Sequence, residues 1–284
     1  MQRLPTLAWL VALALAAALL SCSPKTAMTP STPAAPAEPA MPVPTSPPAA
    51  VVDMGNPAAE GFDKEGSDPR AIEIADRVME RLGGRGAWDN TRYLTWRFFG
   101  GRRHVWDKWT GDHRLEDGDL VVLHNINDRS GRAWAGDVEI TDPDTLTNRL
   151  EQAYSRWIND AYWLVMPYKL KDSGVTLTYE GEDMTEDGLP AYVLELTFQG
   201  VGRTPQNRYQ VWVDIDKSLV RQWSFYREAA DPEPRFVMPW ANWQTHGDIL
   251  LNDDFGARRH TEVAVLQEVA AEVFSDTKKT LPME

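Results

Sequence analysis

Five histidines are the residues of this sequence best suited to acid–base chemistry or to metal binding. They are His104, His113, His124, His246 and His260. No two of them have the i, i+2 or i, i+4 spacing that lets one strand or helix present a pair of metal ligands. Neighbouring strands could still bring His104 and His113 together across hairpins, with Asp107 or Asp112 as the nearby carboxylate. Since the spacing gives no stronger signal, we predict no metal site and no cofactor.

Nucleophilic catalysis has little support in the sequence. Ser130-Gly131 and Ser173-Gly174 are typical of turns rather than of a nucleophile elbow, and no glycine-rich phosphate loop follows a strand. Acidic residues are so abundant, 42 in all, that no single carboxylate pair is informative. We therefore predict that the protein is not an enzyme, with a hydrolase of unrecognised site as a remaining alternative.

A group of basic side chains lies on the first strands of an otherwise acidic domain. The group comprises Arg97, Arg102, Arg103, Lys108 and Arg114. Charge-assisted hydrogen bonds from these side chains could hold a carboxylate or head group of a ligand. Salt bridges to neighbouring Asp and Glu residues are the commoner outcome for such a group.

The N-terminus has the pattern of an export signal. Arg3 precedes an apolar run from Leu7 to Leu20, which is shorter than the ~20 residues that a membrane-spanning helix needs. The following Ser21 and Cys22, the only cysteine, complete a pattern that resembles the bacterial lipobox. This resemblance implies that residues 1–22 are a lipoprotein signal peptide and that Cys22 is acylated.

Acylation of Cys22 predicts a permanent membrane anchor, because two or more acyl chains suffice for stable anchoring. The neutral Ser23 resembles the sorting signal for the outer membrane. We therefore expect a protein of the cell envelope, lipid-anchored at the outer membrane and facing the periplasm.

Two further regions follow the signal. Residues 23–67 are rich in Pro, Ala, Thr and Ser and have no apolar period, so they predict a disordered tether. Residues 68–284 are long enough for one sizeable core and contain no cysteine, so the folded domain has no disulfide. The formal net charge of −13 opposes binding to nucleic acid, which we exclude as a partner.

The sequence of this domain predicts a mainly β structure with two main helices. The first helix is predicted from Asp68 as N-cap and Pro69 as first residue up to Gly83-Gly84. After Asn90 the apolar period changes to two, and about eleven short strands separated by Gly, Asn and Asp turns predict an antiparallel meander. A second helix, capped by Asp142, interrupts the meander.

The second helix continues into an aromatic stretch that Pro167 ends. The segment from Trp163 to Tyr168 is either a movable cover over a ligand site or a static plug of the domain.

The order of these elements resembles the LolA/LolB superfamily of lipoprotein carriers. The resembling phrases are Val211–Leu219, Trp106–Gly111 and Asn159–Pro167, the last two being similar to an uncharacterised lipoprotein branch. The resemblance implies an open, incomplete antiparallel β-barrel whose concave face is covered by helices. The strong acidity of this chain departs from those carriers.

We therefore expect a membrane-anchored lipoprotein that binds a lipid, an acyl chain or another apolar ligand, with a role in lipid or lipoprotein transport. A structural or interaction lipoprotein with a filled core is the alternative, and the sequence identifies no protein partner. Aromatic and aliphatic side chains of the strands and of the second helix are the candidate ligand contacts. They are Trp96, Phe98, Trp109, Trp157, Trp163, Met166, Tyr192, Leu194, Leu196, Phe198, Val211 and Val213.

Overall fold

Two antiparallel sheets and a small hairpin carry the strands of this computed structural model, which describes residues 55–281. The predicted signal peptide, Cys22 and the tether up to residue 54 lie outside the described residues. Within residues 55–281, no helix combines the length and the hydropathy needed to cross a bilayer.

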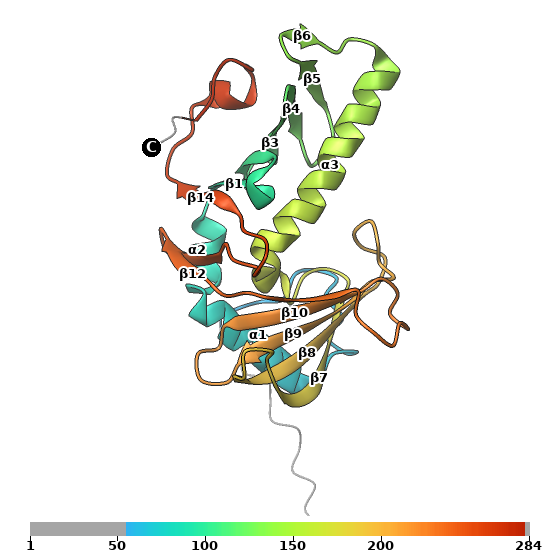
Figure 1. Cartoon of the computed structure of the whole chain (residues 1–284), viewed down its shortest axis with the longest axis vertical. Helices are drawn as coiled ribbons and strands as arrows, with labels where there is room; N and C mark the ends of the chain where they lie inside the picture. The colour runs from blue at the N-terminus through green and yellow to red at the C-terminus, as the bar shows by residue number, and fades with distance from the viewer. Residues whose placement is uncertain (1–54, 282–284) are drawn as a thin grey trace, which may run out of the picture. The chain divides into compact units, whose positions relative to one another are not determined.

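The first sheet, sheet A, has seven strands in the order β14-β1-β2-β3-β4-β5-β6 (Figure 1). Every neighbouring pair is antiparallel, as the meander predicts, and the C-terminal β14 joins the edge next to β1. The strands are β1 (Tyr93–Arg97), β2 (Arg103–Asp107), β3 (Asp112–Asp117), β4 (Leu120–Asn125), β5 (Gly131–Ala135), β6 (Val138–Glu139) and β14 (Thr261–Leu266).

The second sheet, sheet B, has five antiparallel strands in the order β11-β10-β9-β8-β7. They are β7 (Val175–Met184), β8 (Pro190–Phe198), β9 (Arg208–Asp214), β10 (Val220–Tyr226) and β11 (Phe236–Pro239). A separate hairpin pairs β12 (Trp243–His246) with β13 (Ile249–Asn252).

Neither large sheet closes on itself, so the predicted open antiparallel fold is confirmed. The described residues form fourteen strands rather than about eleven. The difference arises because β6, β11 and β12 are only two to four residues long, too short to show a clear period in the sequence.

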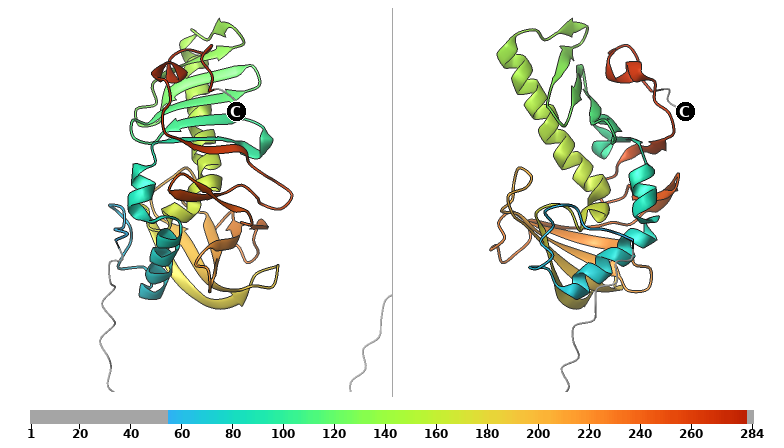
Figure 2. Two further views of the ribbon diagram at one scale, coloured as in Figure 1. Left: turned by 90° about the vertical axis from the view of Figure 1, so that its left-hand side faces the viewer. Right: turned by 180° about the vertical axis from the view of Figure 1, so that it is seen from behind.

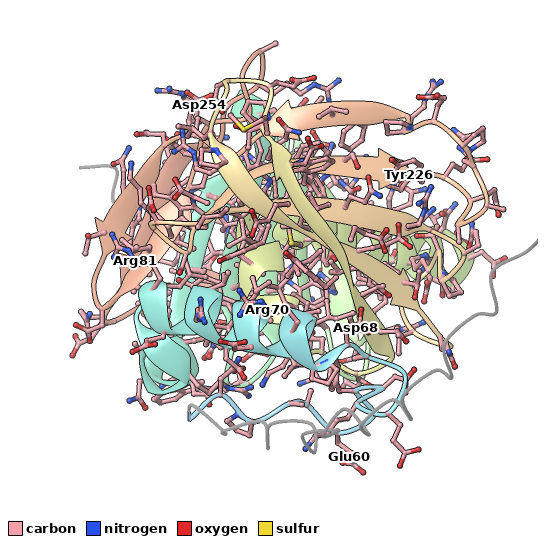
Figure 3. The ribbon with its side chains drawn as sticks, turned by 90° about the horizontal axis from the view of Figure 1, so that it is seen from below. Glu60, Asp68, Arg70, Arg81, Tyr226 and Asp254 are labelled. Atoms are coloured by element: carbon pink, nitrogen blue, oxygen red, sulfur yellow. The ribbon has the colours of Figure 1, made fainter. Side chains whose placement is uncertain are left out.

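Helix α1 (Pro69–Arg81) covers one face of sheet B (Figure 3). Its apolar stripe, which includes Ile74 and Val78, packs in one core with Leu177 and Leu194 of sheet B. Asp68 stands at the predicted N-cap, but its carboxylate accepts a hydrogen bond from the Tyr179 backbone N–H (2.9 Å) instead of capping the helix. This hydrogen bond joins the start of α1 to β7.

Two short segments differ from what the sequence predicts for the first helix and for the tether. A second helix, α2 (Gly84–Asn90), follows α1 directly, with Gly83 in the left-handed conformation between them. Residues 56–67, which the sequence assigns to the tether, contact the domain: Asn56 donates to Asp76 (2.9 Å) and the Ala59 backbone N–H donates to Lys171 (2.9 Å).

Helix α3 (Pro143–Val165) is the long element between the sheets (Figures 1 and 2). Asp142 caps it by accepting a hydrogen bond from the Thr145 backbone N–H (2.9 Å), as predicted. Its N-terminal half packs on sheet A, where Ala153 joins Leu115 and Val122 in one apolar cluster. A 3-10 turn, η2 (Met166–Lys169), continues the chain through Pro167.

The other face of sheet A is covered by the C-terminal segment. Val273 in the 3-10 turn η3 (Ala271–Phe274) packs with Leu281 against Val105. The buried Arg114 donates hydrogen bonds of 3.0 Å to the carbonyls of Val273, Asp276 and Thr277. One short 3-10 turn, η1 (Phe98–Gly100), links β1 to β2.

Candidate functional site

A cavity of about 560 Å³ lies beside the C-terminal half of α3. Its wall is built from α3, the segment from η2 to the start of β7, the end of β8, the start of β9 and the loop between them, and single residues of α2 and β2. The volume falls within the range of about 300–1,000 Å³ found for small-molecule sites. It is therefore large enough to hold a ligand.

The helical repeat explains how α3 supplies one wall. Tyr154, Trp157, Ile158, Ala161 and Tyr162 line the cavity and are spaced three or four residues apart, so they share one face of the helix. The side chains opposite this face come from sheet B and the β8–β9 loop. They are Val175, Phe198, Val201, Thr204, Asn207 and Tyr209.

The charged side chains of the lining are paired. Lys169 forms an ion pair with Asp172, and both line the cavity. Arg203 lies 3.2 Å from Glu151 of α3. Among the described lining residues, the remainder are aromatic, aliphatic or uncharged polar, so the cavity presents a mainly apolar surface without an unpaired charge.

Two tyrosine hydroxyls belong to this lining. Tyr162 of α3 and Tyr209 of β9 have ring centroids 5.4 Å apart. Burial, together with the neighbouring Tyr209, raises the pKa of Tyr162 well above its usual value, and burial raises the pKa of Tyr209 to about 12. Both hydroxyls are therefore protonated at neutral pH.

Three of the twelve residues expected to contact a ligand line the cavity: Trp157, Trp163 and Phe198. Phe98 and Tyr192 are half-buried beside the main core, and Trp109 is 59% exposed. The other six are buried within that core. They are Trp96, Met166, Leu194, Leu196, Val211 and Val213.

The segment from Trp163 to Tyr168 is buried as well. Met166 has no exposed surface and Tyr168 stacks on Trp88 at 4.3 Å, with its hydroxyl donating to the Leu250 carbonyl (2.6 Å). In this structure the segment is therefore packed as part of the core.

A second polar site lies on the face of sheet A that meets α3. His104, His113 and His124 stand on the adjacent strands β2, β3 and β4 and form one hydrogen-bonded chain. His104 Nδ1 lies 3.0 Å from His113 Nε2, and His113 Nδ1 lies 2.8 Å from His124 Nε2. Each ring is at most 5% exposed.

Asp160 of α3 ends this chain. Its carboxylate lies 2.8 Å from His104 Nε2 and accepts two hydrogen bonds from Arg102, at 2.6 and 2.8 Å. Burial opposes ionisation, but the hydrogen bonds from His104 and Arg102 outweigh it, so the pKa of Asp160 lies below its usual value. An ionised Asp160 makes His104 Nε2 the donor.

That choice fixes the tautomers along the chain. If His104 donates from Nε2, its Nδ1 must accept from His113, and His113 Nδ1 must in turn accept from His124. Burial lowers the pKa of His104, although the hydrogen bond to Asp160 raises it in part. Burial, together with the neighbouring His124 and His104, lowers the pKa of His113 well below its usual value. Burial also lowers the pKa of His124 to about 4, so all three rings are neutral at pH 7.

The geometry of the histidine chain does not favour metal binding. Its nitrogens pair in sequence instead of converging on one point, and the described residues contain no group of three metal-ligating side chains. Asp107 is occupied by Arg92 (2.8 Å) and Asp112 by Asn125 (3.0 Å). The strands bring His104 and His113 together, but without either aspartate.

The basic group of the first strands is mostly engaged in ion pairs. Arg102 binds Asp160, Arg114 binds Glu116 (2.6 Å), and both Arg97 and Arg103 reach Glu262, at 2.6 and 3.5 Å. Lys108 donates to the Trp88 carbonyl (2.6 Å), and burial lowers its pKa to about 8. Salt bridging is thus the outcome for the four arginines.

Comparisons with known proteins give structural neighbours only. No protein-family model and no curated protein matches the chain. A DUF1329 family protein from Desulfovibrio piger is 12% identical with a TM-score of 0.38, covering 72% of this chain and 96% of its own. A LolA superfamily protein from Nitrosomonas europaea is 9% identical with a TM-score of 0.31, covering 70% and 96%.

MucB is a third similar structure, at 14% identity, a TM-score of 0.24, and coverage of 73% of this chain and 62% of that chain. A LolA superfamily protein is thus among the neighbours.

Proposed function

We propose that this protein is an envelope lipoprotein, anchored through an acylated Cys22, that holds the acyl chain of a lipid or another apolar ligand in the cavity beside α3. The observation that carries the proposal is the cavity of about 560 Å³ with aromatic walls and no unpaired charge. Transport of that ligand between envelope sites is the role that an anchored, non-enzymatic binding protein would serve.

The energetics favour an alkyl chain as ligand. Burying one methylene is worth about 0.8 kcal/mol, so a chain of roughly 16 carbons gains on the order of 12 kcal/mol if it is fully enclosed. Trp157, Trp163 and Phe198 offer large apolar surfaces for such contacts. If the cavity encloses only part of the alkyl chain, the favourable free energy of burial is smaller in proportion.

Binding of an uncharged alkyl probe tests the proposal. The full-length protein, exchanged from detergent into an amphipathic polymer, is titrated with N-dodecyl dansylamide while energy transfer from tryptophan is recorded. Ser155 lines the cavity from α3, and Ser155→Trp should fill the space and raise the Kd at least about tenfold, a loss of roughly 1.4 kcal/mol.

Thr147→Trp is the matched control, because Thr147 is an exposed residue of the same helix outside the cavity lining. It should bind the probe as the wild type does. A wild-type protein that takes up no probe would support the filled-core alternative instead. Equal affinities for all three proteins would show that the probe binds outside the cavity and would contradict the proposal.

A further inference from the structure

The hydroxyls of Tyr162 and Tyr209 are two polar groups of the cavity lining whose hydrogen-bonding capacity is unused, beside the unpaired indole N–H groups of Trp106 and Trp157. Both residues line the cavity, and neither hydroxyl makes a hydrogen bond to another residue within 55–281. By contrast, the hydroxyl of Tyr168 binds two carbonyls and that of Tyr226 binds Gln210.

Tyr209 is held rigidly in this position. Its ring stacks on Trp223 with centroids 5.3 Å apart and planes 3° from parallel, and Phe198 meets it edge-on at 5.6 Å. Tyr162 approaches the same tryptophan from α3, at 6.3 Å. Donors fixed in this way bind an acceptor without a large ordering cost.

The charges around the cavity argue against an anionic acceptor. The lining cations Lys169 and Arg203 already pair with Asp172 and Glu151. A carboxylate placed against two neutral hydroxyls would lose hydration without gaining a free cation. An uncharged oxygen, such as an ester carbonyl, loses far less on transfer.

We propose, building on the function proposed above, that Tyr162 and Tyr209 form a subsite that donates hydrogen bonds to an uncharged oxygen of the ligand. The ligand class is then a long-chain ester, with its alkyl chain along the aromatic wall and its carbonyl at the tyrosine pair. Free fatty acids and plain hydrocarbons fit this subsite less well.

Displacement of N-dodecyl dansylamide by three competitors of equal chain length tests the subsite in the full-length protein. The competitors are monopalmitoylglycerol, palmitate and hexadecane. The wild type should prefer the ester. Tyr162→Phe and Tyr209→Phe should each weaken the ester about two- to tenfold, the range expected for one hydrogen bond, and leave hexadecane within twofold.

Tyr192→Phe provides the control, since Tyr192 lies on β8 outside the cavity lining and its ring faces Arg70 of α1. It should change none of the three affinities. Unchanged hexadecane binding also shows that each variant keeps an intact cavity.

Two failures can be told apart. If the wild type binds neither the probe nor any competitor, the proposed function itself is wrong. If the probe binds but palmitate displaces it better than the ester does, or if neither Tyr162→Phe nor Tyr209→Phe weakens the ester, the tyrosine subsite is wrong while the apolar cavity remains.

Discussion

At the residue scale, the chain from Asp160 through His104 and His113 to His124 is the least expected part of the core. Its members are fully or almost fully buried, yet each consecutive pair is hydrogen-bonded. A buried polar network of this kind specifies one arrangement of its strands, because a shifted register would leave its members unpaired. It also joins α3 to three strands of sheet A.

The low pKa values of the buried histidines predict that the protein loses stability in mild acid. In the unfolded state each histidine takes up a proton near its usual pKa of 6.5, whereas folded His124 does so only at about 4. The unfolded state therefore binds more protons between these values, and the free energy of unfolding falls as the pH drops, by up to about 1.4 kcal/mol per pH unit for each such histidine.

Urea denaturation at pH values from 7 to 4 measures this slope. His124→Gln replaces the histidine by an amide that cannot titrate. It should make the dependence of the free energy of unfolding on pH shallower by the contribution of one histidine. The charged or titratable groups near the chain are Asp160, Arg102, Arg156 and His260. A wild-type free energy of unfolding that stays level between pH 6.5 and 4 would contradict the neutral, buried state of these rings.

At the scale of elements, the hairpin between β4 and β5 must leave room for His124. Gly131 stands opposite His124 in the sheet. A Cβ on Gly131 would come within 2.6 Å of the His124 Cβ and near the Leu123 carbonyl oxygen. The absence of a side chain at this position is therefore part of what places the histidine chain.

Gly131→Ala should lower the free energy of unfolding by about 1–3 kcal/mol, the usual cost of overpacking. Gly86→Ala is the matched control, because Gly86 lies in α2 with open space around its Cβ position. That substitution should be neutral or stabilise by about 0.5–1 kcal/mol. Equal effects of the two changes in urea denaturation would show that the contact at Gly131 is not restrictive.

The elements differ in how far the sequence could predict them. The start of α3 was predictable, because Asp142 and Pro143 mark it and its apolar residues recur with the helical period. The meander was predictable from alternation in β8 and β9, whereas the short strand β6 has too few residues to show any.

The site was harder to predict than the fold. Alternation alone placed Trp109 among the ligand contacts, but the chain turns after Asp107, whose carboxylate binds the Trp109 backbone N–H (3.0 Å), and this leaves the ring exposed. Val201, Arg203 and Thr204 line the cavity from a loop that has no apolar period. The histidine chain depends on the register between three strands, which turn lengths decide and residue spacing does not show.

At the scale of the whole molecule, an acidic domain is combined with a predicted lipid anchor. The net charge of −13 opposes binding to anionic surfaces and nucleic acid, so the attraction for a ligand must come from apolar burial. The cavity beside α3 provides that burial within the part of the chain that the structure describes. We therefore propose that an alkyl chain occupies this space.

Photo-crosslinking can locate the bound alkyl chain in the protein. The full-length protein is irradiated with a palmitoyl glycerol that carries a diazirine on its alkyl chain, and the modified peptides are identified by mass spectrometry. We expect labelling of α3 between residues 154 and 165 and of residues 198–209, with loss of that labelling in Ser155→Trp. Labelling confined to exposed surfaces such as that around Trp109, or labelling unchanged by Ser155→Trp, would contradict it.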